Sequence, residues 1–242
     1  MEVIRGVVFD LDDTLFFEKD YVLSGFRSVA RAIGNDSNHA EHIFRILSNH
    51  FNSGVRGDIF DRMLAESPML GQQWRVSQLV KLYRTHRPMI ELHSEAAGLI
   101  ANLMEGSVRL AIITDGPVSS QSAKIEALGL ARRFDPIILT DSWGIEYRKP
   151  HPRAFESVMR SWDLSPAQLI YIGDNPDKDF FAPRALGWET ARVRLNGQLR
   201  SDSEARSPEF SPAHEFGTFA DLAAWLRTEC RLMPAQEEES TR

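Results

Sequence analysis

Short runs of consecutive apolar residues recur along the chain. The first run, Val3–Phe9, is rich in β-branched residues and is followed directly by acidic residues. Such continuous apolar runs are typical of strands that are buried on both faces of a parallel sheet. Four further runs of this kind occupy residues 108–113, 137–139, 169–172 and 190–193. Helical patterns separate these four runs, so the chain is predicted to have an α/β core with about five parallel strands.

A long helical segment separates the first run from the second. It covers residues 16–88, whereas one crossover helix between parallel strands needs only about a dozen residues. Apolar residues at helical spacing are found in residues 21–33, 39–51 and 74–83. We therefore expect an all-helical cap at 16–88, a core formed by 1–15 and 89–230, and a disordered tail at 231–242.

Composition and charge exclude several classes of protein. Of the 242 residues, 43% are apolar and 26% are charged, which is ordinary for a globular protein. The net charge of −6 offers no overall basic surface to a nucleic acid polymer. Neither a basic, apolar secretion signal nor an apolar run long enough for a membrane span is apparent, so a cytoplasmic protein is predicted. The single cysteine, Cys230, excludes an internal disulfide framework and a multi-cysteine zinc site.

Acidic residues follow the first predicted strand. Asp10, Asp12 and Asp13 lie within four positions, at the carboxyl edge of a parallel sheet, where ligands of open α/β sheets bind. Crowded carboxylates repel one another and need a cation, and a few oxygen ligands with room for water and phosphate favour magnesium over calcium. A solvated turn rich in aspartate is the alternative for this segment taken alone.

Three other segments add polar groups at the same edge. Thr114 and Asp115 follow the second strand and precede a helix, where a hydroxyl and free backbone N–H groups can bind an anion. Lys149 precedes another helix and is one of only five lysines in the chain. Asp174 and Asp179 follow the fourth strand and can complete a metal site. Each segment alone is also compatible with an ordinary turn, a helix cap or a surface cation.

Together and in this order, the four segments resemble the four motifs of the haloacid dehalogenase superfamily, whose members are mostly magnesium-dependent phosphohydrolases. The resemblance covers residues 3–15 and 94–195, and the helical insert is similar to the C1 cap of that superfamily. It implies a Rossmann-like, doubly wound parallel sheet with the strand order 3-2-1-4-5.

The resemblance also implies a role for each residue. Asp10 would be the nucleophile that becomes an aspartyl phosphate, and Asp12 would be the general acid and base. Thr114, the backbone N–H of Asp115 and Lys149 would bind the phosphoryl group. Magnesium would be bound by the Asp10 carboxylate, the Asp12 carbonyl and Asp174, with support from Asp179. In addition, Thr14 is expected to donate its hydroxyl to the backbone, and Asp13 is expected to be solvated.

The substrate is predicted to be a small phosphorylated metabolite, such as a sugar phosphate or a nucleotide, because a helical cap excludes polymers. Asp12 favours phosphoryl transfer over dehalogenation. A phosphomutase, a signalling receiver domain and an inactive relative that binds a partner are the alternatives. A monomer and a homodimer are both compatible with the sequence. Cap residues that could face the site are Phe17, Lys19, Tyr21, Arg56, Arg75, Arg84, His86 and Arg87.

Overall fold

Six parallel strands form one sheet in a computed structural model that describes residues 3–228. The strand order is β3-β2-β1-β4-β5-β6. The strands are β1 (Gly6–Phe9), β2 (Arg109–Thr114), β3 (Ile137–Leu139), β4 (Leu169–Gly173), β5 (Glu189–Val193) and β6 (His214–Phe216). The first five strands lie in the predicted order. The sixth was missed because it is a three-residue edge strand with a polar sequence, in which Glu215 is exposed.

The central position of β1 brings the acidic segments together. Phe9 is in register with Ile112 of β2 on one side and with Ile172 of β4 on the other. All three strands run in the same direction, so the residues that follow them emerge at one edge of the sheet.

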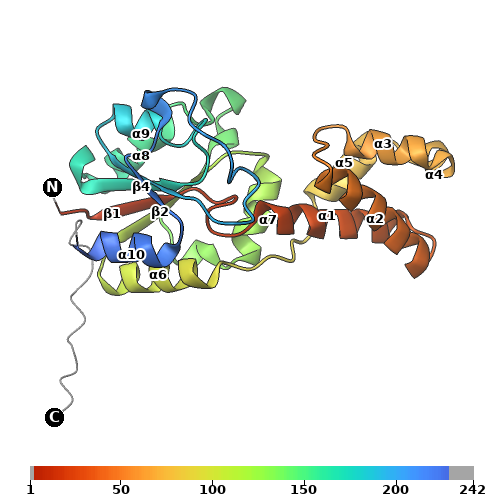
Figure 1. Ribbon diagram of the computed structural model, residues 1–242, viewed down its shortest axis with the longest axis horizontal. Coiled ribbons are helices and arrows are strands. Elements are labelled where there is room, and N and C mark those ends of the chain that lie inside the picture. Colours follow the sequence, from red (N-terminus) through yellow and green to blue (C-terminus); the bar gives the residue numbers. More distant parts are fainter. Residues whose placement is uncertain (1–2, 229–242) are drawn as a thin grey trace, which may run out of the picture.

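Both faces of the sheet are covered by helices, as Figure 1 shows. Side chains of successive strand residues point to opposite faces, so Val7 and Phe9 pack into one core and Val8 into the other. The first core is shared with α6 (Ser94–Glu105), α7 (Val118–Ala127) and α10 (Phe219–Thr228), and the second with α8 (Arg153–Trp162) and α9 (Phe181–Ala185). Short 3-10 helices cover Leu130–Arg132, Thr140–Ser142, Ile145–Tyr147, Pro166–Gln168 and Pro208–Phe210.

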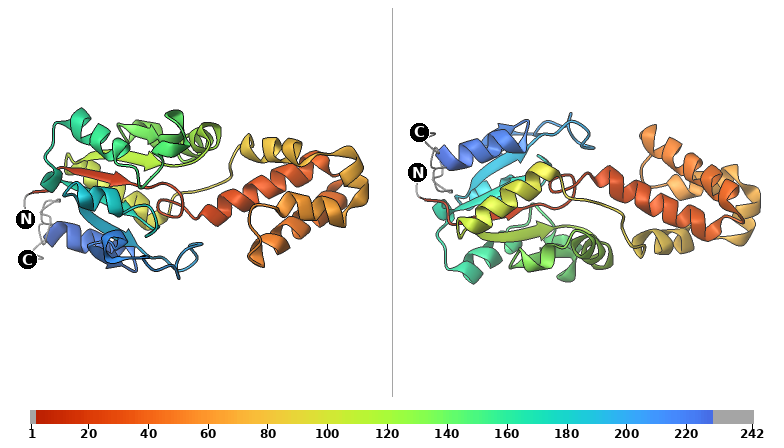
Figure 2. Two further views of the ribbon diagram at one scale, coloured as in Figure 1. Left: turned by 90° about the horizontal axis from the view of Figure 1, so that it is seen from above. Right: turned by 90° about the horizontal axis from the view of Figure 1, so that it is seen from below.

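The remaining helices form a separate body beyond the carboxyl ends of the strands (Figures 1 and 2). They are α1 (Glu18–Ile33), α2 (Ser37–Asn52), α3 (Ile59–Glu66), α4 (Pro68–Gln73) and α5 (Val76–Arg84). Their buried apolar residues form a cluster of their own, which includes Phe26, Leu47 and Leu79. The helical content of this insert agrees with the sequence pattern, although α3 and α4 were not anticipated.

Among residues 3–228, no helix combines the length and the apolar character required to cross a bilayer. The segment 231–242, predicted to be disordered, and Cys230 lie outside the described residues.

Candidate active site

Three buried carboxylates meet at the carboxyl edge of the sheet. Asp10 directly follows β1, whereas Asp174 and Asp179 follow β4, and one oxygen of each lies within 4.8 Å of the others. Gly173 allows this approach, because a Cβ atom there would lie 2.6 Å from an Asp179 carboxylate oxygen. Oxygen atoms grouped in this way are suited to a hard divalent cation such as Mg²⁺.

The charges of these groups explain why a cation is needed. Burial raises the pKa of Asp174 well above its ordinary value, and the nearby Asp179 and Asp10 carboxylates raise it further. One Asp174 oxygen, Oδ2, is buried without a hydrogen-bond partner among residues 3–228. The donor set therefore fits a bound magnesium ion, which would offset both the burial and the repulsion.

Lys149 is in contact with two of these carboxylates. Its Nζ lies 2.7 Å from Asp10 Oδ1 and 2.7 Å from Asp179 Oδ1, and it donates a hydrogen bond to the Tyr171 hydroxyl at 2.7 Å. Burial raises the pKa of Asp10, but the charges of Lys149 and Lys178 outweigh this effect and the pKa is lowered. Asp10 is thus held ionised, as a nucleophilic carboxylate must be.

The loop after β2 carries the predicted anion-binding residues. The Thr114 hydroxyl is buried and has no hydrogen-bond partner within the described part of the chain. Asp115 Oδ1 accepts hydrogen bonds from the Thr140 hydroxyl at 2.7 Å and from the backbone N–H of Lys149 at 3.1 Å. Asp115 thereby ties the β2 loop to the segment that carries Lys149, a contact that the sequence did not reveal.

Asp12 is held by helix α7. Lys124 Nζ lies 2.6 Å from Asp12 Oδ1, and the Gln121 side chain donates a hydrogen bond to Oδ2 at 2.8 Å. Lys124 also lies over the ring of Tyr21 in α1, 4.1 Å from the ring centroid. This cation–π contact links Asp12 to the inserted helices. Neither Lys124 nor Gln121 was a candidate, because they belong to a helix that carries no recognised motif.

Two expectations for the first acidic segment were wrong. Asp13 is buried rather than solvated, and its carboxylate accepts hydrogen bonds of 2.7 Å from the backbone N–H groups of Glu18 and Leu199. These bonds hold the start of α1 and a distant loop together. Thr14 donates its hydroxyl to Asp174 Oδ1 at 3.3 Å rather than to the backbone. Leu199 and Asp174 lie far along the chain from their partners. The turn that brings Glu18 next to Asp13 is not defined by the hydrophobic pattern.

Lys178 is a further cation of the site that the sequence reading missed. Its Nζ lies 3.6 Å from Asp10 Oδ2 and 3.6 Å from Asp115 Oδ2. Its position between Asp174 and Asp179 in the sequence was the available signal. Three of the five lysines in the chain therefore contact the acidic residues of this site.

Few of the suggested cap residues have contacts that connect them with the site. Tyr21 contacts Lys124, and the His86 ring lies against Tyr21 with centroids 4.9 Å apart. Arg56 and Arg75 instead donate to backbone carbonyl groups of the inserted helices themselves.

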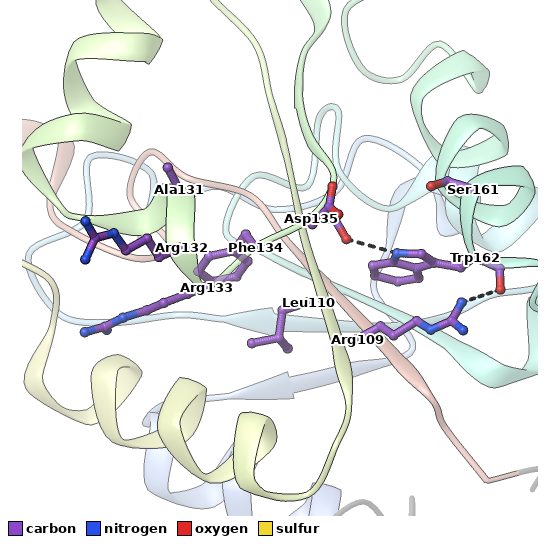
Figure 3. A pocket seen from close by; sticks show the side chains of 9 residues that line it. All are labelled: Arg109, Leu110, Ala131, Arg132, Arg133, Phe134, Asp135, Ser161 and Trp162. Atoms are coloured by element: carbon purple, nitrogen blue, oxygen red, sulfur yellow. Dashed lines mark hydrogen bonds between the residues drawn. The ribbon is translucent and has the colours of Figure 1, made fainter.

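A groove of about 520 Å³ lies away from this site, near the start of β2. It is lined in part by Arg109, Arg132 and Arg133, but their guanidinium groups do not converge, as Figure 3 shows. Arg109 donates to the backbone carbonyl of Trp162, whose indole in turn donates to the Asp135 carbonyl at 3.0 Å. The groove therefore has no arranged set of polar groups comparable to that around Asp10.

The profile of one protein family, described as haloacid dehalogenase-like hydrolase, matches residues 7–193. This span includes the buried carboxylates Asp10, Asp174 and Asp179 together with Lys149. The chain belongs to the haloacid dehalogenase-like hydrolases. The family predicted from the four motifs is thus confirmed.

Two of the relatives of this hydrolase are named as phosphatases of phosphate esters. A glyceraldehyde 3-phosphate phosphatase of Methanocaldococcus jannaschii is 27% identical over 206 residues, which is 82% of this chain and 88% of that protein. A phosphoserine phosphatase of Thermus thermophilus is 28% identical over 154 residues, covering 64% of this chain and 59% of that protein. These names agree with the predicted enzyme class of phosphoric monoester hydrolase.

Solved structures of the haloacid dehalogenase-like hydrolases share the fold. A hydrolase of Bacillus subtilis bound to magnesium matches with a TM-score of 0.65 and 21% identity, over 93% of this chain and 99% of that one. A hydrolase of Deinococcus radiodurans with bound phosphate and sodium matches with a TM-score of 0.65 and 20% identity, over 97% of this chain and 100% of that one. The predicted Rossmann-like fold is confirmed.

Proposed function

We propose that the protein is a magnesium-dependent phosphohydrolase that acts on a small phosphorylated metabolite through an aspartyl phosphate on Asp10. The observation that carries this proposal is the environment of Asp10. Its carboxylate is buried, is paired with Lys149 at 2.7 Å, and lies beside Asp174 and Asp179. A nucleophile kept ionised next to a metal-binding cluster is the arrangement that phosphoryl transfer through a carboxylate requires.

In the first half-reaction, an Asp10 oxygen attacks phosphorus and the bond from phosphorus to the ester oxygen breaks. Asp12 donates a proton to the leaving oxygen, so that an alcohol is released. Lys124 and Gln121 set the orientation of the Asp12 carboxylate through their contacts of 2.6 Å and 2.8 Å. Thr114 donates its otherwise unpartnered hydroxyl to a phosphoryl oxygen.

In the second half-reaction, a water oxygen attacks the phosphorus of the aspartyl phosphate and Asp12 takes the proton of that water. The bond from phosphorus to the Asp10 oxygen breaks, which releases inorganic phosphate and regenerates the carboxylate. Asp10, Asp174 and the Asp12 carbonyl would hold the metal, with Asp179 in support. When bound, Mg²⁺ supplies positive charge that allows a phosphoryl dianion to approach a carboxylate.

We further propose that residues 16–88 act as a cap over a core formed by 1–15 and 89–230. The cap helices lie beyond the carboxyl ends of the strands, and Tyr21 of α1 contacts Lys124 next to Asp12. A cap that closes over Asp10 would favour small substrates of the sugar phosphate or nucleotide class over polymers. A cytoplasmic location, and a monomer or homodimer, stay predictions from the sequence.

The test is phosphate release from a panel of phosphorylated metabolites and from p-nitrophenyl phosphate, with Mg²⁺ and with a chelator. We expect release that depends on Mg²⁺ in the wild type and less than about 1% of it in Asp10→Asn, since the nucleophile supplies most of the acceleration. Circular dichroism verifies that the variant is folded. Turnover by folded Asp10→Asn above a few per cent would exclude Asp10 as the nucleophile, and an isomerised ester in phosphorus NMR would indicate a mutase instead.

A further inference from the structure

The ammonium group of Lys149 is already surrounded by acceptors. An ammonium has three hydrogens, and three oxygens lie 2.7 Å from Lys149 Nζ: Asp10 Oδ1, Asp179 Oδ1 and the Tyr171 hydroxyl. The side chain is fully buried. Lys149 is therefore placed to hold Asp10 and Asp179 in position through its charge.

Lys178 differs from Lys149 both in its distances to acceptors and in its burial. Its Nζ lies 3.6 Å from Asp10 Oδ2 and from Asp115 Oδ2, and both separations exceed the length of a hydrogen bond. The ammonium is thus attracted to both carboxylates without being hydrogen-bonded to either. The exposed fraction of its side chain is 25%, compared with 0% for Lys149. The Lys178 side chain is therefore more accessible to a substrate than the Lys149 side chain.

Asp115 determines where Lys178 is attracted. Asp115 Oδ1 is fixed by the Thr140 hydroxyl and the Lys149 backbone N–H, which leaves Oδ2 to face Lys178. A carboxylate in an anion-binding loop would repel a phosphoryl group, and the neighbouring ammonium offsets this repulsion. The carboxylates of Asp10 and Asp115 together keep Nζ between the nucleophile and the β2 loop.

We propose that Lys178 is a second cation that donates to the transferring phosphoryl group, beside Lys149, which also holds Asp10 and Asp179 in position. This inference rests on the proposed phosphohydrolase function and assigns a binding residue within it. A phosphoryl oxygen placed next to Asp10 meets the free hydrogens of Lys178 on the solvent side and the Thr114 hydroxyl on the β2 loop. Charge-assisted hydrogen bonds of this kind are the strong ones in phosphate sites.

The experiment compares Lys178→Met with the wild type by isothermal titration with inorganic phosphate in the presence of Mg²⁺. We expect about 10- to 100-fold weaker binding, which corresponds to the loss of one hydrogen bond between charged groups. The KM of a substrate identified in the panel should rise by a similar factor, because the contact is made in the bound state as well as in the transition state. Lys178→Arg keeps the charge and should recover part of the affinity, whereas Lys81→Met on the exposed face of α5 is the control and should bind phosphate like the wild type.

The Asp115→Asn variant distinguishes a direct contact between Lys178 and phosphate from mere neutralisation of the Asp115 charge by Lys178. It keeps an oxygen for Thr140 and Lys149 and removes the charge that faces Lys178. If Lys178 touches the phosphoryl group, Lys178→Met weakens phosphate binding by at least about tenfold in the Asp115→Asn background too. If the effect vanishes in that background, Lys178 only neutralises Asp115 and the proposal is wrong. Unchanged phosphate binding by the folded single variant would also overturn it.

Failure of the proposed function gives a different result. If the wild type releases no phosphate from any substrate but binds inorganic phosphate through Lys178, the hydrolase proposal is wrong. The assignment of Lys178 as a binding residue then still holds. If the wild type hydrolyses esters and the Asp10→Asn variant does not, the proposed function holds. It holds even if Lys178→Met binds phosphate normally, a result that would reject only the role of Lys178.

Discussion

Replacement of Lys149 by methionine provides a sharp test of how the site is held together. The substitution keeps a similar volume but removes the ammonium that lies 2.7 Å from both Asp10 and Asp179. Loss of one partner from a buried ion pair costs about 3–5 kcal/mol of folding free energy. Lys178 still compensates Asp10 from 3.6 Å, so we expect the lower end, about 3 kcal/mol.

For a chain of this size, about 3 kcal/mol corresponds to a Tm lowered by about 6–12 °C. The assay is thermal and urea unfolding followed by circular dichroism, without added metal. Burial raises the pKa of Asp179, and Lys149 opposes that rise. Without Lys149 the Asp179 pKa rises further, so the loss of stability should grow as the pH rises and Asp179 ionises without its cation.

A double variant and a control make this result interpretable. Lys149→Met with Asp179→Asn should recover about 1–2 kcal/mol relative to Lys149→Met alone, because one unpaired buried charge is gone. Lys81→Met, on an exposed helix surface, should change stability by less than about 0.5 kcal/mol. A Lys149→Met protein as stable as the wild type at pH 8 would refute the reasoning that this ammonium compensates the buried acids.

Two further predictions follow from the charges of the site. The wild-type protein should become more stable in the presence of Mg²⁺, by about 2.7 kcal/mol at a hundredfold excess over Kd. The Asp174→Asn variant should lose most of this gain. An equal response of both proteins to Mg²⁺ would exclude Asp174 as a ligand. Burial, followed by repulsion from Asp12, raises the pKa of Glu18 to about 7 from 4.5. The folded state then retains a proton that the unfolded chain releases above pH 4.5, so Glu18 costs stability that grows as the pH rises through 7 and is absent below 4.5. Because the side chain is 32% exposed, we expect Glu18→Gln to be more stable than the wild type by about 1 kcal/mol at pH 8 and equal to it at pH 4; equal unfolding midpoints at pH 8 would contradict this interpretation.

The first five strands of the sheet, and the edge at which its acidic residues lie, could be predicted from the sequence. Continuous apolar runs such as Val3–Phe9 bury on both faces whatever their neighbours are, and residues that follow parallel strands must share an edge. Asp10, Thr114 and Asp174 could therefore be assigned to one site before any distance was known. The short polar strand β6 was not recognised, because its pairing with β5 depends on the neighbouring strand rather than on apolar content.

Which cation pairs with which carboxylate depends on the tertiary structure. Ion pairs and hydrogen bonds between distant segments depend on distances of a few ångströms, and a one-dimensional pattern carries no such information. For this reason the sequence did not show that Lys124 holds Asp12, that Lys149 lies between Asp10 and Asp179, or that Asp13 is buried. The local sequence defines which polar side chains each segment carries. The packing of the segments defines what each of these side chains contacts.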